Sequence, residues 1–175
     1  MADFMWENLF SKEAGKHTTY MALKKNILFS GLNPRELKLV EKIVNVRRYR
    51  PSEPIFKQGE VGVGMYIIVD GAVNISVEEL DTTSSETRTH HVIQLKAGEF
   101  FGELALVENN GRRSASASSQ EETTVIGFFK PDLIEIIDRN PTAGVKILMM
   151  LGEVLGIRLR ETTSRITEMK KEHRR

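Results

Sequence analysis

The sequence predicts an α+β fold in which a zone of short antiparallel strands lies between two helical zones. Apolar residues recur at helical spacing up to about residue 45, and the same spacing returns from Pro131 onward. Between them, from residue 46 to about 130, short apolar runs are separated by turn residues, many of them glycine. Many short strands at close spacing predict an antiparallel roll, barrel or sandwich.

The N-terminal zone is predicted to be helical. Its apolar residues at helical spacing are Met5, Leu9, Met21, Leu23, Ile27, Leu28, Leu37, Val40 and Val44. The stretch 29–34 interrupts this pattern, and Asn33, Pro34 and Glu36 then match a helix start, with asparagine as N-cap and proline at the first helical position. We therefore expect an N-terminal helical extension over 1–32, followed by a helix that opens the central domain.

The central domain, expected over 33–139, contains the predicted strands. They cover 46–50, 65–69, 73–77, 91–95 and 123–129. The polar run 78–89 between two of them is predicted to be an exposed hairpin loop. No repeat of solenoid length is evident.

The C-terminal zone is predicted to hold two helices, one over 131–137 and a longer one from Thr142 to about Lys170, within a segment that covers 140–175. The long helix carries one apolar stripe, made of Leu148, Leu151, Leu155, Leu159, Ile166 and Met169. We expect this stripe either to pack on the strands or to pair with a second copy of the chain.

Composition limits the possible functions. The 175 residues carry a net charge of only +1, which does not indicate a dedicated nucleic-acid binder. The chain has no cysteine, which excludes disulfides, thiolate nucleophiles and cysteine-bound zinc. No signal-peptide pattern is present, and the longest apolar stretch, 145–159, is interrupted by charged residues. We expect a cytoplasmic protein that contacts neither membrane nor nucleic acid and holds no metal.

One short segment, Phe100 to Leu106, carries most of the chemistry. A strand is predicted to end at Phe101, and Gly102 permits a tight turn into one helical turn that begins at Glu103. The first N–H groups of such a turn have no intrahelical partner and lie at the positive end of the helix dipole. This arrangement predicts an anion site that suits a phosphate.

The loop that follows brings two arginines back toward the same turn, in the run Arg112-Arg113-Ser114-Ala115-Ser116. The Arg113 guanidinium can pair with two phosphate oxygens, and Ser114 adds a hydroxyl donor. A carboxylate at Glu103 would repel a phosphate, unless the ligand also offers a hydroxyl such as a ribose 2′-OH. Without a ligand, Glu103 is expected to balance the arginine. The alternative is a surface ion pair between Glu103 and arginine that binds no ligand.

Residues 101–106, together with the following Arg-Ser-Ala, resemble the phosphate-binding cassette of the cyclic-nucleotide-binding domain family. This family includes the bacterial catabolite activator protein and the regulatory subunits of cyclic-AMP-dependent protein kinase. The resemblance extends from about Leu28 to Ile166 and includes the Gly59 turn, Tyr66-Ile67-Ile68 and Asn140-Pro141. It implies an eight-stranded antiparallel β-roll, similar to a double-stranded β-helix or jelly roll, with N-terminal helices and a long C-terminal helix.

The resemblance also implies roles for individual residues: backbone contacts from Gly102 and Ala105, a bond from the 2′-OH to Glu103, and a phosphate pair with Arg113. The implied ligand contacts are Gly102, Glu103, Leu104, Ala105, Arg113, Ser114, Ala115, Thr162 and Thr163. Family members place the arginine nine or ten positions after the glutamate. We favour Arg113 over Arg112 because it opens the Arg-Ser-Ala run. Thr162 and Thr163 resemble base-contacting hydroxyl residues of the long helix; the alternative is an ordinary polar helix face.

The resemblance implies a regulatory sensor in signal transduction, with cAMP favoured over cGMP as ligand and no cofactor. We expect the nucleotide to shift the flanking helices, and a separate effector protein to respond. The alternative function is a nucleotide-free β-roll scaffold that binds a partner protein. A DNA-binding regulator is less favoured because no helix-turn-helix follows the long helix. We do not expect an enzyme, since no acid–base pair, metal cluster or activated nucleophile is evident.

Overall fold

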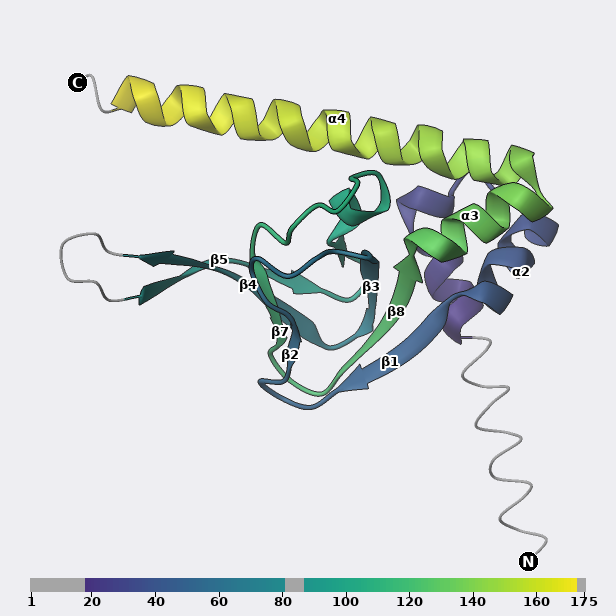
Figure 1. Cartoon of the computed structure of the whole chain (residues 1–175), viewed down its shortest axis with the longest axis horizontal. Helices are drawn as coiled ribbons and strands as arrows, with labels where there is room; N and C mark the ends of the chain where they lie inside the picture. Colours follow the sequence, from purple (N-terminus) through teal and green to yellow (C-terminus); the bar gives the residue numbers. More distant parts are fainter. Residues whose placement is uncertain (1–17, 81–86, 173–175) are drawn as a thin grey trace, which may run out of the picture.

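A computed structural model describes residues 18–80 and 87–172 of the chain. Within this part, strands form two four-stranded antiparallel sheets that enclose a roll, and helices cover one end and one side of it (Figure 1). The strand order is β1-β8-β3-β6 in one sheet and β2-β7-β4-β5 in the other. The predicted α+β class and the eight-stranded antiparallel β-roll with a long C-terminal helix are confirmed.

The strands follow the sequence pattern closely. Their bounds are β1 Asn45–Tyr49, β2 Pro54–Phe56, β3 Gly64–Asp70, β4 Ala72–Leu80, β5 Thr87–Lys96, β6 Phe100–Phe101, β7 Ser116–Ser119 and β8 Thr123–Phe129. β8 lies between β1 and β3, and β4 lies between β5 and β7. The sequence pattern did not reveal β2 and β7, because one has three residues led by proline and the other is made of serine and alanine.

The hairpin prediction for 78–89 is partly wrong. β4 continues to Leu80 and β5 begins at Thr87, so the ladder extends into the predicted loop at both ends. The polar side chains there do not oppose strand formation, because this part of the hairpin extends away from the roll and its side chains are exposed (Figure 1). The middle of the run, 81–86, lies outside the described residues.

The N-terminal elements lie at one end of the roll. Helical residues 18–25 lead to a short helix, η1 (Ile27–Phe29), and then to α2 (Pro34–Ile43). The predicted helix start is confirmed: the Asn33 side chain accepts hydrogen bonds from the N–H groups of Arg35 and Glu36, and the Glu36 side chain accepts one from the Asn33 N–H. The predicted helical residues Met5 and Leu9 lie outside the described part.

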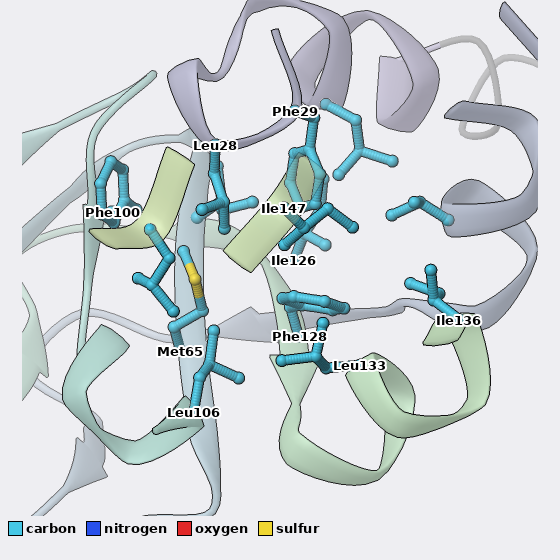
Figure 2. Close-up of a cluster of buried hydrophobic side chains, with 14 of the residues drawn as sticks. Leu28, Phe29, Met65, Phe100, Leu106, Ile126, Phe128, Leu133, Ile136 and Ile147 are labelled. Atoms are coloured by element: carbon cyan, nitrogen blue, oxygen red, sulfur yellow. The ribbon is translucent and has the colours of Figure 1, made fainter. Parts of the chain in front are cut away.

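One apolar core joins the helices to the roll. The Phe29 ring of η1 packs edge-on against Phe128 of β8, with ring centroids 5.6 Å apart. Leu133 and Ile136 of α3 (Lys130–Arg139) and Ile147 of the long helix α4 (Pro141–Glu172) close around this pair (Figure 2). A second apolar cluster fills the roll itself, made of Tyr66, Ile68, Val73, Leu95, Phe101, Ala117 and Val125. The helices therefore pack against strands of the same roll that carries the candidate site.

α4 (Pro141–Glu172) crosses one side of the roll and continues beyond it (Figure 1). Its first half packs on the core through Ala143, Ile147, Leu151 and Val154, all of which are buried. From Leu159 to Lys171 every residue is exposed. The apolar stripe predicted for this helix is therefore divided, since Leu151 packs on the body while Leu148, Leu159, Ile166 and Met169 remain exposed. No helix in the described part has the length and apolar character to span a bilayer.

Candidate ligand-binding site

The turn at Gly102 forms as the sequence predicts. β6 ends at Phe101, Gly102 adopts a left-handed conformation with φ of 76°, and a short helix, η2 (Glu103–Leu106), follows. The Ala105 N–H donates to the Gly102 carbonyl at 3.3 Å. Within the described residues, the N–H groups of Glu103 and Leu104 have no recorded hydrogen bond. Two backbone donors are therefore available at the start of this turn.

Arg113 lies over the same turn, and its side chain is almost completely buried. Its exposed fraction is 8%, and the guanidinium stacks on the Phe56 ring with its central carbon 4.0 Å from the ring centroid. Nη2 donates to the Gly64 carbonyl at 2.7 Å and Nη1 to the Gly102 carbonyl at 3.1 Å. A guanidinium has five N–H donors, so further donors remain for another acceptor.

Among the described residues, Arg113 forms no ion pair, although the charges of Glu60 and Glu103 act on it and raise its pKa. Burial lowers the pKa of its guanidinium, although arginine remains protonated at neutral pH. No carboxylate of the described residues lies within ion-pair distance of it. Because burying an unpaired charge costs free energy, such a site favours the binding of an anion.

Glu103, by contrast, already has a cationic partner. Its side chain is 8% exposed, and Oε1 accepts a bond from Nη1 of Arg158, on α4, at 2.5 Å. Arg158 also donates from Nη2 to the Phe100 carbonyl at 3.1 Å and stacks over the Phe100 ring at 4.6 Å. The prediction that Glu103 balances the cassette arginine is therefore only partly correct, because its charge raises the pKa of that arginine while its ion pair is formed with Arg158. The cause is α4, which brings a second guanidinium to the carboxylate.

A cavity of about 710 Å³ connects these groups. One wall comes from the cassette, with residues 102–105 and 113–115. A second wall is apolar and comes from the strands, with Phe56, Ile75, Val77, Val92, Ile93 and Leu95. The third comes from α4, with Arg158, Glu161, Thr162 and Arg165. The cavity thus offers a cationic end, an apolar side and a polar helical side to one ligand, and its volume lies in the range of small-molecule sites.

All of the predicted contact residues except Thr163 line this cavity. Thr162 and Thr163 each donate from the hydroxyl to the carbonyl four residues earlier, at 2.8 Å. Arg112 also lines the cavity, but it is exposed and its Nη1 donates to the Gly59 carbonyl at 2.7 Å. Between the two candidate arginines, Arg113 alone is buried over the Gly102 turn.

Sequence reasoning missed Phe56, Arg158 and the apolar wall. The strict alternation of Val73, Ile75 and Val77 was a usable signal for one strand of that wall. Phe56 and Arg158 gave no local signal, because each meets its partner only after distant segments fold together. Among the described residues, no group of three histidine, aspartate or glutamate side chains is placed to hold a metal ion.

A β-roll with a buried arginine over a glycine-led turn defines a class of ligand-binding module. The family described as "Cyclic nucleotide-binding domain" matches residues 46–140, more than half of the chain. The chain belongs to the cyclic nucleotide-binding domain family, as its cassette predicts.

Known relatives agree with this assignment. The "Cyclic AMP receptor protein" of Thermus thermophilus is 34% identical over 139 residues, which cover 79% of this chain and 60% of the relative. The cyclic nucleotide-gated channel beta-3 of mouse is 31% identical over 120 residues, covering 67% of this chain and 16% of the channel. The chain thus spans less than two thirds of the length of either protein.

Solved structures show the same fold. The catabolite activator protein of Thermus thermophilus has a TM-score of 0.69 at 32% identity, covering 83% of this chain and 63% of that one. The regulatory domain of Toxoplasma gondii PKA, crystallised with cAMP, has a TM-score of 0.59 at 26% identity, covering 71% and 45%. Ligand-bound members of the family therefore share this β-roll.

Proposed function

We propose that this protein is a regulatory sensor that binds one 3′,5′-cyclic mononucleotide in the cavity, with cAMP preferred over cGMP. The observation that carries the proposal is the buried Arg113 guanidinium, which has spare donors and forms no ion pair with any carboxylate in the described part of the chain. A cyclic phosphodiester carries one negative charge and two free oxygens, which match a planar guanidinium. The nucleotide is bound and released without a chemical reaction.

The cavity suggests how each part of the nucleotide binds. The phosphate meets Arg113, the N–H groups of Glu103 and Leu104, and the Ser114 hydroxyl. The ribose 2′-OH donates to the Glu103 carboxylate. The backbone of Gly102, Ala105 and Ala115 contacts the sugar and its phosphate. The base then extends along the apolar wall toward Thr162 on α4. In this arrangement Thr163 does not contact the nucleotide that is bound in the cavity of the same chain.

Two considerations support cAMP over cGMP. The Thermus relative is named as a receptor for cyclic AMP, and the Toxoplasma regulatory domain was solved with cAMP. In addition, the side of the cavity that faces the base is apolar, and guanine has a carbonyl and an N–H that adenine lacks. Burying these groups without hydrogen-bond partners costs free energy.

The signal is proposed to pass through α4. This helix contributes to the cavity, and its first half packs on the apolar core. A nucleotide that contacts both the cassette and α4 in one helix position stabilises that position relative to others. A difference of a few kcal/mol between the two states is enough to operate a switch. An effector protein that contacts the N-terminal helices or α4 would detect the change.

A homodimer through α4 is also part of the proposal. Positions on its exposed side alternate by three and four residues, as in a two-stranded coiled coil: Val145, Leu148, Gly152, Leu155, Leu159, Thr162, Ile166 and Met169. Six of these eight positions are apolar, and four of the six are at least 49% exposed. A strict seven-residue repeat keeps one seam in contact with a supercoiled partner, so a second copy of this chain fits this face.

The division into an extension over 1–32, a roll over 33–139 and a helical segment over 140–175 remains a prediction. So does a cytoplasmic location, which we propose because a receptor must occupy the compartment that contains its cyclic nucleotide. The rival function is a scaffold that binds a partner protein and no nucleotide.

Thermal unfolding with a panel of nucleotides separates the two functions. A ligand that binds only the folded state raises the melting temperature with its concentration. We expect cAMP to raise it most, cGMP less, and the linear 5′-AMP and cyclic dinucleotides little. A melting temperature that no cyclic mononucleotide changes would favour the scaffold.

A further inference from the structure

β1 (Asn45–Tyr49) is an edge strand whose outer edge has no partner strand in the described part of the chain. It pairs with β8 on one side and stands at the end of the order β1-β8-β3-β6. In an antiparallel strand the N–H and C=O groups of alternate residues point to opposite edges, so those of every second residue point away from β8. Beyond the ladder with β8, no backbone hydrogen bond of residues 45–49 is recorded among the described residues. The outer edge therefore offers donors and acceptors to a further strand.

The same strand carries positive charge without ion-pair partners. Arg47, Arg48 and, directly after the strand, Arg50 are exposed, and none of them forms an ion pair with a carboxylate of residues 18–80 or 87–172. Consecutive residues of a strand point to opposite faces of the sheet, so Arg47 and Arg48 place one cation on each face. The Arg47 guanidinium lies over the Phe129 ring, 5.0 Å from its centroid, which limits its freedom. A strand added beside β1 would meet an arginine on both faces.

The charges decide which occupant fits this edge. A second copy of β1 does not fit, because antiparallel pairing would place arginine beside arginine, and like charges on paired strands are destabilising. A nucleic acid fits poorly, because a phosphate backbone only accepts hydrogen bonds, whereas this edge presents both donors and acceptors. The net charge of the chain is also only +1. An extended acidic peptide segment pairs with both kinds of backbone group and with the arginines.

We propose that the outer edge of β1 binds an extended acidic segment of a partner protein, which joins the sheet as a further strand. Two carboxylates, of Glu53 and Glu122, line a hollow of about 650 Å³ beyond the end of β1, so the acidic side chains of the partner bind beside Arg47 and Arg48 instead of further along. Neither arginine lines the nucleotide cavity, so this partner site is separate from the proposed nucleotide site.

The position of β1 leaves this edge accessible in a dimer. In the view of Figure 1, α4 crosses one side of the roll and β1 lies on the opposite side. A second copy that is bound along the exposed face of α4 therefore does not cover β1. Each chain of such a dimer can bind its own acidic segment.

The test measures the fluorescence anisotropy of a labelled acidic peptide of about nine residues, made of glutamate, valine and threonine and long enough to cover the strand. We expect the wild type to bind it, and to bind it more weakly as salt is added, because exposed charges are screened. Arg47→Glu combined with Arg48→Glu should weaken binding about ten-fold or more, since two attractive cross-strand pairs become repulsive. The matched control combines Lys38→Glu with Arg160→Glu, which changes the net charge equally at exposed positions of α2 and α4. It should bind as the wild type does.

A second peptide separates strand addition from attraction between charges. It has the same sequence, but every backbone nitrogen is methylated, so it keeps the charge and has no N–H donor. Because a strand ladder needs these donors, we expect binding about ten-fold weaker or undetectable. Equal binding of the two peptides would overturn the inference.

Three other results would also overturn it: no binding of the acidic peptide by the wild type, an equal loss in the control pair, or tighter binding of a single-stranded oligonucleotide of the same length. Circular dichroism checks that the variants fold. If the first pair unfolds, Arg48→Glu combined with Arg50→Glu replaces it, since neither of these arginines stacks on an aromatic ring in the described part. The same loss is expected, and unchanged affinity would contradict the proposal.

Discussion

Gly102 lies directly against the guanidinium of Arg113. A β-carbon on Gly102 would stand 2.5 Å from Nη1 of Arg113, far closer than atoms can approach. The Gly102 carbonyl accepts a bond from the same nitrogen at 3.1 Å. Glycine is therefore needed here both for its positive φ and because the arginine occupies the space of any side chain.

The first prediction concerns Gly102→Ala. The new methyl group would displace the Arg113 guanidinium, and the positive φ adds about 1 kcal/mol of backbone strain. We expect the affinity for cAMP, measured by calorimetry, to fall about ten-fold or more, because the main anion ligand moves.

Gly98→Ala is the matched control for this variant. Gly98 also has a positive φ, of 92°, but a β-carbon there would meet no atom within 4 Å. We expect a similar loss of stability from backbone strain and an unchanged affinity for cAMP. Equal loss of affinity in the two variants would show that strain, rather than contact with Arg113, is responsible.

A second prediction concerns the buried pair that attaches α4 to α2. Nζ of Lys146 lies 2.8 Å and 2.9 Å from the two carboxylate oxygens of Glu36, whose side chain is 6% exposed. The bond from Lys146 holds the pKa of Glu36 below its ordinary 4.5, helped by the backbone N–H of Asn33 and opposed by burial. The pair therefore stabilises the fold above pH 4.5, and this contribution is lost as the pH falls through the folded-state pKa.

Lys146→Met leaves the Glu36 carboxylate buried without its cation. Because Lys146 is itself 36% exposed, we expect a loss of about 1–3 kcal/mol in the free energy of unfolding at neutral pH. Urea titrations should show the difference from wild type shrinking as the pH falls below 4.5, because protonation of Glu36 removes the charge that Lys146 compensates. Lys38→Met, on an exposed position of α2, is the control for lost charge. A difference that stays constant with pH would contradict this account.

A third prediction tests the exposed face of α4. Leu159 is 68% exposed and lies in the middle of the seven-residue repeat. We expect light scattering to show a dimer for the wild type and a shift to monomer for Leu159→Glu, because a carboxylate in the seam would be desolvated. Arg160→Glu, on the neighbouring polar position, should leave the dimer intact. A wild type that is monomeric at high concentration, with and without cAMP, rules out this interface.

Site residues that lie close together in the sequence could be predicted. Site residues that meet only after distant segments fold together were missed. Gly102, Glu103 and Arg113 lie within one short segment, and the capping pattern at Asn33 is complete in four residues. The ion pair of Glu103 with Arg158 was missed, because Arg158 reaches the carboxylate only after α4 has packed across the roll. Phe56 was overlooked for the same reason, since its strand is short and its contact with Arg113 depends on the closed roll.

The central claim is that Arg113 receives the phosphate of a cyclic nucleotide, and calorimetric titration with cAMP tests it most directly. The account predicts one site per wild-type chain, with a dissociation constant of about 10 μM or lower, and an affinity about 100-fold lower for Arg113→Ala. The neighbouring Arg112→Ala should bind nearly as the wild type does. Unchanged affinity in Arg113→Ala, or loss confined to Arg112→Ala, would contradict the account.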